Sequence, residues 1–399
     1  MISDRSSRIP PFYVMEVLER AQELERDGRD IVHLEIGEPD FDTPEPVKEA
    51  AWRALKDGKT QYTHSLGVPL LREAIAAHYN ERYGVEVSPG NIVVTSGTSP
   101  AMVLIFAALL NPGDEFILSN PCYACYPNIL ELVGGIPRYV EVSEEDGFKY
   151  RPERIKEQLS LRVKGVMINS PSNPTGIVLS AADTEELVGV VGERAYLISD
   201  EIYHGLVYEG REHSVLEFTD RCFVLNGFSK LYAMTGWRLG YIISPPEFVR
   251  PLQKIQQNLL ICANSFVQWA GIAALTETGP HVRRMVETYE KRREYILKRI
   301  KDLGFGVLTD PTGAFYVFAN AKRFTGDAYG FCMEVLENAG VALTPGIDFG
   351  SNGEGYVRFS YANSLSNIEE GMRRLEEFLK ERGGEDVAQL EVRGLKRSH

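Results

Sequence analysis

Short apolar runs, mostly of β-branched residues, recur along the first two thirds of the chain and alternate with longer stretches of helical periodicity. The runs lie at residues 92–95, 115–118, 138–142, 163–169, 195–199, 222–225 and 239–243. Buried strands that alternate with helices are typical of α/β proteins, in which helices cover a mostly parallel sheet. The pattern therefore predicts a large α/β domain built on a mostly parallel, seven-stranded sheet.

The pattern changes after residue 243. Helical periodicity continues at 247–257 and 266–277, and an amphipathic stretch without proline or glycine follows at 281–303. This last stretch is long enough to connect two domains. Beyond it we expect a smaller α+β domain, with strands at 305–308, 314–318 and 356–360 and a helix at 328–339.

The N-terminal part of the chain carries a helical pattern at 14–27 and a strand pattern at 31–35, and we expect both to pack with the smaller domain. A length of 399 residues agrees with two domains packed together. The last residues, 385–399, are expected to form a solvated tail. The predicted division is an N-terminal segment over 1–44, a large domain over 45–290 and a small C-terminal domain over 291–399.

The overall charge is negative, with 43 basic against 56 acidic residues and a net charge of -13. No stripe rich in lysine and arginine offsets it, so nucleic acid is not an expected partner. No apolar run approaches the length of a membrane span, and residues 1–8 are polar rather than signal-like. We expect a soluble, cytoplasmic protein with neither a membrane nor a nucleic acid as its partner.

Five cysteines and the lack of an Asn-x-Ser/Thr acceptor agree with a reducing compartment. Cys122 and Cys125 form a C-x-x-C pair, which raises the alternatives of a redox site or a zinc site. A redox site needs a small redox domain around the pair, and a zinc site needs a second pair of ligands. Neither is visible, so we interpret both cysteines as small side chains in a loop and expect no metal.

Lys230 lies just beyond the apolar run 222–225, in the stretch N-G-F-S-K-L-Y-A-M-T-G-W-R-L-G-Y of residues 226–241. An ammonium ion is costly to bury without a partner. A lysine that reaches solvent from a strand end is one interpretation. The other is a lysine of lowered pKa that forms a Schiff base with a carbonyl cofactor. Arg238 suits a phosphate as a bidentate donor, and the stretch as a whole favours the cofactor site.

The stretch Ser96-Gly97-Thr98-Ser99-Pro100 lies between a strand pattern and the apolar helix pattern at 101–110. Glycine lets the backbone approach an anion closely, the hydroxyls donate hydrogen bonds, and a helix N-terminus presents unpaired amides. These features indicate a phosphate site, although an ordinary capped strand-to-helix turn has the same residues. The stretch is neither a P-loop nor a G-x-G-x-x-G fingerprint, so it implies no nucleotide.

Asp200 and Glu201 end the strand predicted at 195–199. Two adjacent carboxylates suit a metal or acid catalysis, but His204 is the one histidine nearby and no second is suitably spaced. The alternative is that Asp200 pairs with a cationic ring nitrogen and keeps a pyridine protonated. Glu201 is then structural.

Two further stretches carry candidate binding residues. In Ser170-Pro-Ser-Asn-Pro-Thr-Gly176 paired prolines fix the chain around Asn173, so that its amide is aimed, although a plain turn is the alternative. Arg358 lies in the alternating stretch Y-V-R-F-S-Y without an acidic residue near it in sequence. It is therefore a candidate clamp for a carboxylate, against the alternative of a solvated surface arginine.

Together these stretches resemble the class I and II aminotransferases, in the subgroup that includes many prokaryotic aspartate aminotransferases. The motifs are I-G-E-P-D-F, S-P-S-N-P-T-G, S-D-E-I-Y, S-K followed by T-G-W-R-L-G-Y, and Y-V-R-F-S-Y-A. The resemblance runs from about Arg8 to about Leu379. It implies a fold-type-I enzyme that depends on pyridoxal 5'-phosphate, with a large domain and a smaller α+β domain.

The resemblance also implies roles for single residues around the cofactor. Lys230 is the Schiff-base lysine and the proton shuttle, and Asp200 pairs with the pyridine nitrogen. Tyr203 and Asn173 donate to the phenolic oxygen, and Tyr123, in P-C-Y-A-C-Y-P, stacks on the ring. The phosphate is held by Gly97, Thr98, Ser229, Arg238 and Tyr62 of the partner subunit. A homodimer with shared active sites follows from that last role.

For the substrate, the resemblance implies that Arg358, Asn173 and the backbone of Gly37 bind the α-carboxylate. The sequence departs from its relatives at two positions. Gly227 stands where many of them have serine, which removes one phosphate hydroxyl, and Thr98 stands where some aspartate-specific relatives have lysine. The segment at 9–14, which closes over the substrate in relatives, is apolar and aromatic. We therefore expect a neutral amino donor such as alanine or an aromatic or aliphatic amino acid.

The function predicted is an aminotransferase of amino-acid metabolism that works by a ping-pong mechanism, with 2-oxoglutarate and glutamate as the shared pair. Aspartate aminotransferase is the alternative for the substrate, and a lyase that uses the same cofactor and fold is the alternative for the reaction. A regulator with an aminotransferase-like domain would carry a DNA-binding domain ahead of it. Fewer than about 40 residues precede Gly37, which is too few for such a domain.

Overall fold

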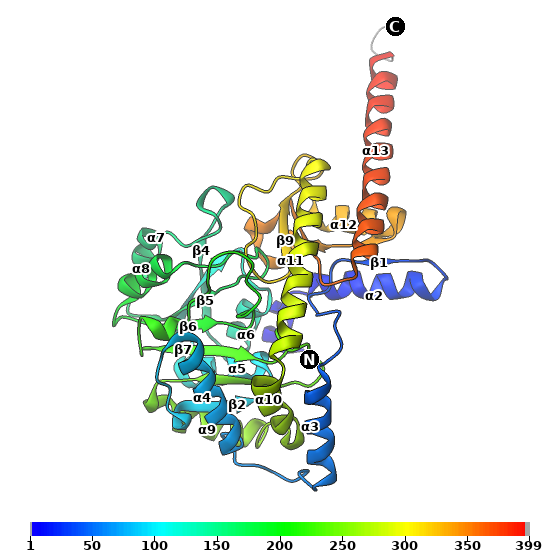
Figure 1. Cartoon of the computed structure of the whole chain (residues 1–399). Coiled ribbons are helices and arrows are strands. Elements are labelled where there is room, and N and C mark those ends of the chain that lie inside the picture. Colours follow the sequence, from blue (N-terminus) through cyan, green and yellow to red (C-terminus); the bar gives the residue numbers. More distant parts are fainter. Residues whose placement is uncertain (1, 396–399) are drawn as a thin grey trace.

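The computed structural model describes the backbone of residues 2–395 and the side chains of residues 2–4 and 6–382. Seven strands form one sheet in the order β2-β8-β7-β6-β5-β3-β4 (Figure 1). They are β2 (Ile92–Thr95), β3 (Glu115–Asn120), β4 (Ile136–Glu141), β5 (Val163–Asn169), β6 (Tyr196–Asp200), β7 (Cys222–Gly227) and β8 (Gly240–Ile243). Strand β8 is antiparallel to both of its neighbours, and the other pairs are parallel. The predicted mostly parallel, seven-stranded sheet is confirmed.

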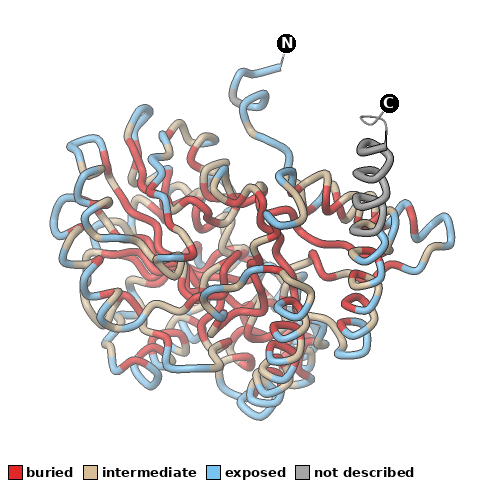
Figure 2. The backbone as a smooth tube through the Cα atoms, turned by 90° about the horizontal axis from the view of Figure 1, so that it is seen from above, coloured by how far each residue is buried: buried red, intermediate tan, exposed pale blue. Residues whose placement is uncertain are grey.

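The large sheet is covered on both faces because its central strands are apolar at successive positions. In β7, Phe223 and Leu225 belong to one hydrophobic cluster, and Cys222 and Val224 belong to another. Side chains alternate between the two faces of a strand, so each face has its own core. Figure 2 shows the buried segments gathered in the middle of the molecule, with exposed backbone around them.

Two groups of helices supply these cores. The first cluster contains residues of α5 (Thr98–Leu109), α6 (Cys125–Val133) and α9 (Pro246–Leu259). The second contains residues of α3 (Glu45–Lys56), α4 (Pro69–Tyr83), α7 (Pro152–Gln158), α8 (Ala181–Val191) and α10 (Ser265–Glu277). None of the helices that the structure describes is long and apolar enough to cross a lipid bilayer.

The long helix α11 (Gly279–Asp302) leads to a second, smaller sheet (Figure 1). This sheet is antiparallel, with the order β11-β12-β9. Its elements and those near it are β9 (Tyr316–Asn320), α12 (Ala328–Ala339), β10 (Val341–Ala342), β11 (Thr344–Pro345), β12 (Tyr356–Ser360) and α13 (Leu365–Leu395).

The N-terminal segment packs against this smaller unit. It contains α1 (Asp4–Arg8), α2 (Tyr13–Arg26) and β1 (Val32–His33). Strand β1 pairs in parallel with β10, and α2 contacts α12 and β11. The division into three parts at residues 44 and 290 stays a prediction.

Three local predictions need correction or lie beyond the description. No strand forms at 305–308, where Gly306 makes an isolated pairing with Asn320, and β9 begins at Tyr316 rather than at 314. Strands β10 and β11 were not predicted, because two residues are too few to show a period. The backbone stays helical to Leu395. The solvated tail predicted at 385–399 lies beyond the last described side chain, so its exposure stays a prediction.

We predict that Gly165→Ala destabilises the large sheet. A Cβ at Gly165 in β5 would lie 2.4 Å from the ring of Phe116 and 2.9 Å from Ile198, both of which are fully buried. Overpacking of this kind costs about 1–3 kcal/mol, and thermal denaturation measures it. Gly189→Ala is the matched control, because Gly189 lies in α8 with open space around it and alanine favours a helix. Equal midpoints for both variants would contradict the prediction.

Candidate functional site

A cavity of about 570 Å³ lies where the carboxyl ends of the central strands meet the N-terminal segment and the smaller sheet. Ligand sites in open α/β sheets lie at this edge, and their volumes are typically about 300–1,000 Å³. Most of the residues singled out from the sequence line it. They are Gly37, Thr98, Tyr123, Asn173, Asp200, Tyr203, Ser229, Lys230, Arg238 and Arg358.

Lys230 follows the end of β7 by three residues, so the strand carries it to the sheet edge. Its Nζ donates a hydrogen bond to the backbone oxygen of Gly37, 2.5 Å away. Burial, together with the charges of Arg358 and Arg238, lowers the pKa of the Lys230 ammonium to about 8, although Glu38 and Asp200 oppose the shift. A substantial share of this lysine is therefore a free amine at neutral to mildly alkaline pH, which is the form that attacks a carbonyl group.

Asp200 is the last residue of β6 and is buried. Its Oδ2 accepts a hydrogen bond from the Tyr126 hydroxyl at 2.7 Å, and its Oδ1 accepts one from the backbone N–H of Ile202 at 3.2 Å. Burial raises the pKa of the Asp200 carboxyl to about 6, although both hydrogen bonds lower it. A cationic partner in the cavity would therefore stabilise the ionised form of the Asp200 carboxylate.

Glu201, the next residue, points into a different environment. Its carboxylate accepts hydrogen bonds from Tyr79, Ser199, Ser214 and the backbone of Val215. It does not line the cavity, which agrees with the interpretation that Glu201 is structural. The described residues also contain no group of three or more His, Cys, Asp and Glu side chains that could hold a metal.

Arg358 reaches the cavity from β12 in the smaller sheet. Its guanidinium donates to Asn173 Oδ1 at 2.8 Å, to the backbone oxygen of Glu35 at 2.5 Å and to Thr344 Oγ1 at 3.1 Å. It also lies over the ring of Tyr316, with 4.4 Å to the centroid. Arg358 is buried, its Nε has no hydrogen-bond partner, and none of the ion pairs among the described side chains includes it, so its charge is available to an anionic ligand.

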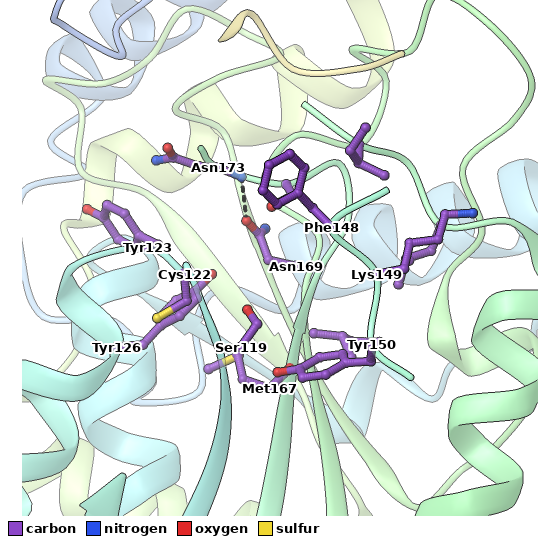
Figure 3. Close-up of a pocket in the computed structure, with 14 residues that line it drawn as sticks. Ser119, Cys122, Tyr123, Tyr126, Phe148, Lys149, Tyr150, Met167, Asn169 and Asn173 are labelled. Carbon is purple, nitrogen blue, oxygen red and sulfur yellow. Dashed lines mark hydrogen bonds between the residues drawn. The ribbon is translucent and has the colours of Figure 1, made fainter. Parts of the chain in front are cut away.

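A hydrogen bond to its backbone N–H holds Asn173 in place. Its N–H donates to Asn169 Oδ1 at 2.8 Å, as Figure 3 shows, and the Asn169 amide donates in turn to the backbone oxygen of Asp200 at 2.9 Å. The chain therefore ties the ends of β5 and β6 to the loop that carries Asn173. The Asn173 side chain is left to contact Arg358 and the cavity.

One end of the cavity has the features of a phosphate site. Gly97 precedes α5 with φ +100°, and the helix has no side-chain cap at its N-terminus. A Cβ at Gly97 would lie 2.8 Å from a guanidinium nitrogen of Arg238, so only glycine leaves room there. The hydroxyls of Thr98, Ser99 and Ser229 line the same cavity. Uncapped amides, hydroxyls and an arginine together suit a phosphate dianion.

Gly227 has a packing reason of its own. A Cβ at this position would lie 2.9 Å from the backbone oxygen of Leu239 and 3.1 Å from the Cα of Gly240. The departure from serine at Gly227 therefore coincides with close approach of β7 and β8.

Aromatic side chains form the walls. The Tyr203 hydroxyl lies 2.8 Å from the Tyr316 hydroxyl, and Tyr123 packs edge-on against both Tyr126 and Phe12. Figure 3 shows Tyr123 and Tyr126 beside Cys122 and across from Asn173, around a smaller neighbouring cavity. Such rings give a flat ligand an apolar surface on which to stack.

Three residues that the sequence singled out do not line this cavity. Tyr62 is 79% exposed and does not line the cavity of this single chain. Cys122 and Cys125 form no disulfide. Burial raises the pKa of the Cys122 thiol to about 12 and that of the Cys125 thiol above its ordinary value, which disfavours the reactive thiolate. The redox alternative for this pair loses its support.

The structure adds site residues that the sequence did not single out, among them Tyr126, Asn169 and Tyr316. Asn169 could have been predicted from the sequence, because it ends a predicted strand at the same sheet edge as Asp200. Tyr126 lies 74 residues from the carboxylate it contacts and Tyr316 lies 113 residues from Tyr203, so no local pattern marks either one.

Comparison with known proteins gives consistent matches over nearly the whole chain. The model of the family described as aminotransferase class I and II matches residues 29–375. The (5-formylfuran-3-yl)methyl phosphate transaminase of Methanocaldococcus jannaschii is 43% identical over 383 residues, which cover 95% of this chain and 100% of the relative. The aspartate aminotransferase of Thermotoga maritima is 40% identical over 386 residues, which cover 96% and 100%.

A solved structure extends the likeness to three dimensions. The aspartate aminotransferase of Thermus thermophilus with maleate has a TM-score of 0.90 at 38% identity, and the match covers 94% of this chain and 99% of that one. Shared fold and sequence over both sheets mean that the likeness concerns the whole architecture.

We predict that Asp200→Asn stabilises the cofactor-free protein above about pH 6. The folded protein binds the Asp200 proton more tightly than the unfolded chain does, so this group costs stability as the pH rises from about 4 to about 6. Asparagine keeps an oxygen acceptor for Tyr126 and removes the charge, which should recover on the order of 3 kcal/mol at pH 7. Thermal denaturation between pH 4 and pH 8 measures the gain.

Asp42→Asn is the control for this experiment. Asp42 is exposed, and its hydrogen bond with Lys48 holds the pKa of its carboxyl below the ordinary value, so removal of its charge should bring no gain. A gain for both variants, or one for Asp200→Asn that is the same at pH 4 and pH 8, would contradict the account of Asp200.

Proposed function

This chain belongs to the class I and II aminotransferases, which depend on pyridoxal 5'-phosphate, and on that premise we propose that it transfers the amino group of a neutral L-amino acid to a 2-oxo acid. 2-Oxoglutarate and glutamate form one of its substrate pairs, and two half-reactions alternate at one site. The observation that carries the choice of donor is the apolar wall of the cavity described below. A cytoplasmic location and the lack of nucleic-acid and membrane partners are part of the proposal.

The residues around the cavity fit this cofactor. Lys230 offers an amine of lowered pKa to its aldehyde, and Asp200 offers a buried carboxylate to its ring nitrogen. The cradle at Gly97 and Arg238 suits its phosphate, since a Cβ at Gly97 would fill that space. The hydroxyl of Tyr203 and the amide of Asn173 are polar groups on the remaining wall.

When bound, pyridoxal phosphate supplies a protonated ring that takes up negative charge from the substrate. Asp200 keeps that ring nitrogen protonated, because a buried carboxylate gains from a cationic partner. Tyr123 would stack on the ring, while Asn173 and Tyr203 would donate to its phenolic oxygen. Gly97, Thr98, Ser229 and Arg238 would hold the phosphate.

Lys230 holds the cofactor covalently between turnovers. With the cofactor bound and an amino acid in place of the lysine, its Nζ would be a free amine that could carry the α-proton across the site. The pKa of about 8 supports both tasks, because the amine loses and regains a proton near neutral pH. Arg358, with Asn173 and the backbone of Gly37, binds the α-carboxylate and so fixes which hydrogen faces Lys230.

The wall on the N-terminal side supports a neutral side chain on the donor. Its apolar residues are Phe12, Val14, Met15, Leu18 and Ile36, with Gln22 and Glu38 as the polar ones. The cationic groups that line the cavity within the described chain are Lys230, Arg238 and Arg358. Each has a role already, so none of the three remains for the second carboxylate of aspartate.

Aspartate remains the alternative donor, since relatives named as aspartate aminotransferases share about two fifths of their residues with this chain. A lyase with the same cofactor is the alternative reaction, and no contact in the cavity favours it over transamination. Production of ammonia or pyruvate without an added oxo acid would identify the lyase.

The test of the proposed function is kcat/KM for alanine, phenylalanine, leucine and aspartate with 2-oxoglutarate as acceptor. We expect a neutral donor to lead, because the apolar wall desolvates it at little cost. A lead of tenfold or more for aspartate, about 1.4 kcal/mol of transition-state discrimination, would refute the choice of donor.

We predict that Arg358→Leu raises KM for every amino acid by roughly 100-fold or more, since loss of a hydrogen bond to a charged group costs about 1.5–3 kcal/mol and leucine also removes the charge. The measurement is the ratio of KM values across the donor panel. Arg292→Leu is the matched control, because Arg292 is also a buried arginine but pairs with Asp40 at 2.7 Å outside the cavity. A defect confined to one donor would contradict a role in binding the shared α-carboxylate.

A homodimer with shared active sites completes the proposal. Tyr62 is exposed, as are Trp52 in α3, Leu70 in α4 and Leu259 in α9, so each of these elements offers an exposed apolar side chain to a second copy. In the dimer Tyr62 of the partner subunit would contact the phosphate.

We predict that Lys230→Ala and Tyr62→Ala chains complement each other. A mixed dimer then has one site with an intact Lys230 and an intact Tyr62, whereas neither parent has any complete site. If the two chains pair at random, about half of the dimers are mixed, so titration of an equal mixture with cofactor should recover wild-type affinity in about a quarter of its sites. Failure of the mixture to recover it, or sedimentation of a fully active monomer, would contradict the shared site.

A further inference from the structure

Helix α2 begins without a capping side chain of its own. Its N-cap residue is Phe12, whose side chain cannot accept a hydrogen bond from the first turn. The first amides of a helix have no partner within the helix, and they carry its positive partial charge. An acceptor from elsewhere in the chain is therefore needed to hold this end of α2.

Asp348 supplies that acceptor from a distant part of the sequence. Its Oδ1 accepts a hydrogen bond from the N–H of Tyr13 at 2.9 Å, and its Oδ2 accepts one from the N–H of Val14 at 3.4 Å. The two partners lie about 335 residues from it along the chain. Asp348 is 8% exposed, and it belongs to a short 3-10 turn (Gly346–Phe349) that follows β11.

The amides that Asp348 holds are those of the cavity wall. Phe12 and Val14, on either side of Tyr13, both line the cavity, and the Phe12 ring packs edge-on against Tyr123 at 6.4 Å. Other contacts also hold this segment: Arg8 pairs with Glu131, a weak ion pair because Arg8 is exposed, and the Tyr13 ring packs against Tyr329 at 5.1 Å. Among them Asp348 is the buried side chain that hydrogen-bonds the first amides of α2 from the smaller unit.

Asp348 is also linked to the anion-binding side of the site. Phe349, the next residue, lies under the guanidinium of Arg358, with 5.0 Å to the ring centroid. The same turn therefore contacts the arginine and, through Asp348, the start of α2. A shift of this turn would move both the apolar wall and the support of Arg358.

We propose that Asp348 is a positioning residue for the donor side chain, which acts by capping α2 and so fixing Phe12 and Val14 over the cavity. This inference rests on the proposed function, because it concerns the wall that receives a neutral donor. Burial raises the pKa of the Asp348 carboxyl to about 6, with Arg358 lowering and Glu16 raising it, so the group is mostly ionised at neutral pH. Its negative charge then faces the positive end of the helix.

The test uses the cofactor-loaded enzyme and the variants Asp348→Ala and Asp348→Asn. Alanine removes both acceptors, so the wall is ordered in a smaller fraction of the molecules. The apparent affinity for the donor falls with that fraction. We expect KM for the preferred donor to rise roughly tenfold, about 1.4 kcal/mol, with kcat changed by less than about twofold. Asparagine keeps one acceptor oxygen and should give an intermediate KM.

Hydrogen–deuterium exchange supplies a readout that does not depend on turnover. In Asp348→Ala the amides of residues 12–17 should exchange faster than in the wild type, while those of α12 should not change. Asp327→Ala is the matched control, because Asp327 caps α12 of the same unit through Gly330 at 2.9 Å and does not line the cavity. It should speed exchange in α12 and leave KM unchanged.

The proposal is overturned if Asp348→Ala leaves KM or the exchange of residues 12–17 unchanged, or if Asp327→Ala raises KM equally. It is also overturned if Asp348→Asn shifts neither KM nor the exchange rate of residues 12–17 in the direction in which Asp348→Ala shifts them. Failure of the proposed function has a different signature, which is a wild-type enzyme that prefers aspartate. KM for aspartate and the exchange rates then still decide whether Asp348 positions the wall.

Discussion

The site depends on the burial of an ammonium group and a carboxylate at one sheet edge without an ion pair between them. Lys230 donates to a backbone oxygen, and Asp200 accepts from a phenol and an amide. Burial shifts both pKa values toward the neutral forms, to about 8 and about 6. Two such groups are costly in an empty protein, and a ligand that offers an aldehyde to one and a cationic nitrogen to the other lowers that cost.

The large sheet makes this arrangement possible. Strands β6 and β7 are adjacent and parallel, so the residues that follow their carboxyl ends arrive at one edge. Successive residues at a strand end also point in different directions. Asp200 therefore faces the cavity. Glu201 instead accepts hydrogen bonds from Tyr79, Ser199 and Ser214, which stabilise the fold. The alternation of side chains at the strand end thus places one carboxyl group in the cavity and the other in a hydrogen-bond network of the fold.

Much of this could be predicted from the sequence, because the strands of the large sheet have clear apolar runs and the reactive residues follow them directly. The rest depends on contacts between distant segments. Tyr126 is marked only by its hydrogen bond to Asp200, and Asp348 only by its two bonds to the start of α2. The strand expected at 305–308 does not form for a related reason, since Gly306 pairs with Asn320 at the very end of β9 and a single pairing is not a ladder.

The most direct test of the account is to locate the covalent bond between cofactor and protein. The enzyme is loaded with pyridoxal 5'-phosphate, reduced with borohydride and digested with trypsin, and the peptides are analysed by mass spectrometry. We expect the reduced cofactor on Lys230, in a peptide of residues 222–238 in which cleavage after Lys230 is blocked. A cofactor found on another lysine, or released without attachment, would contradict the central claim.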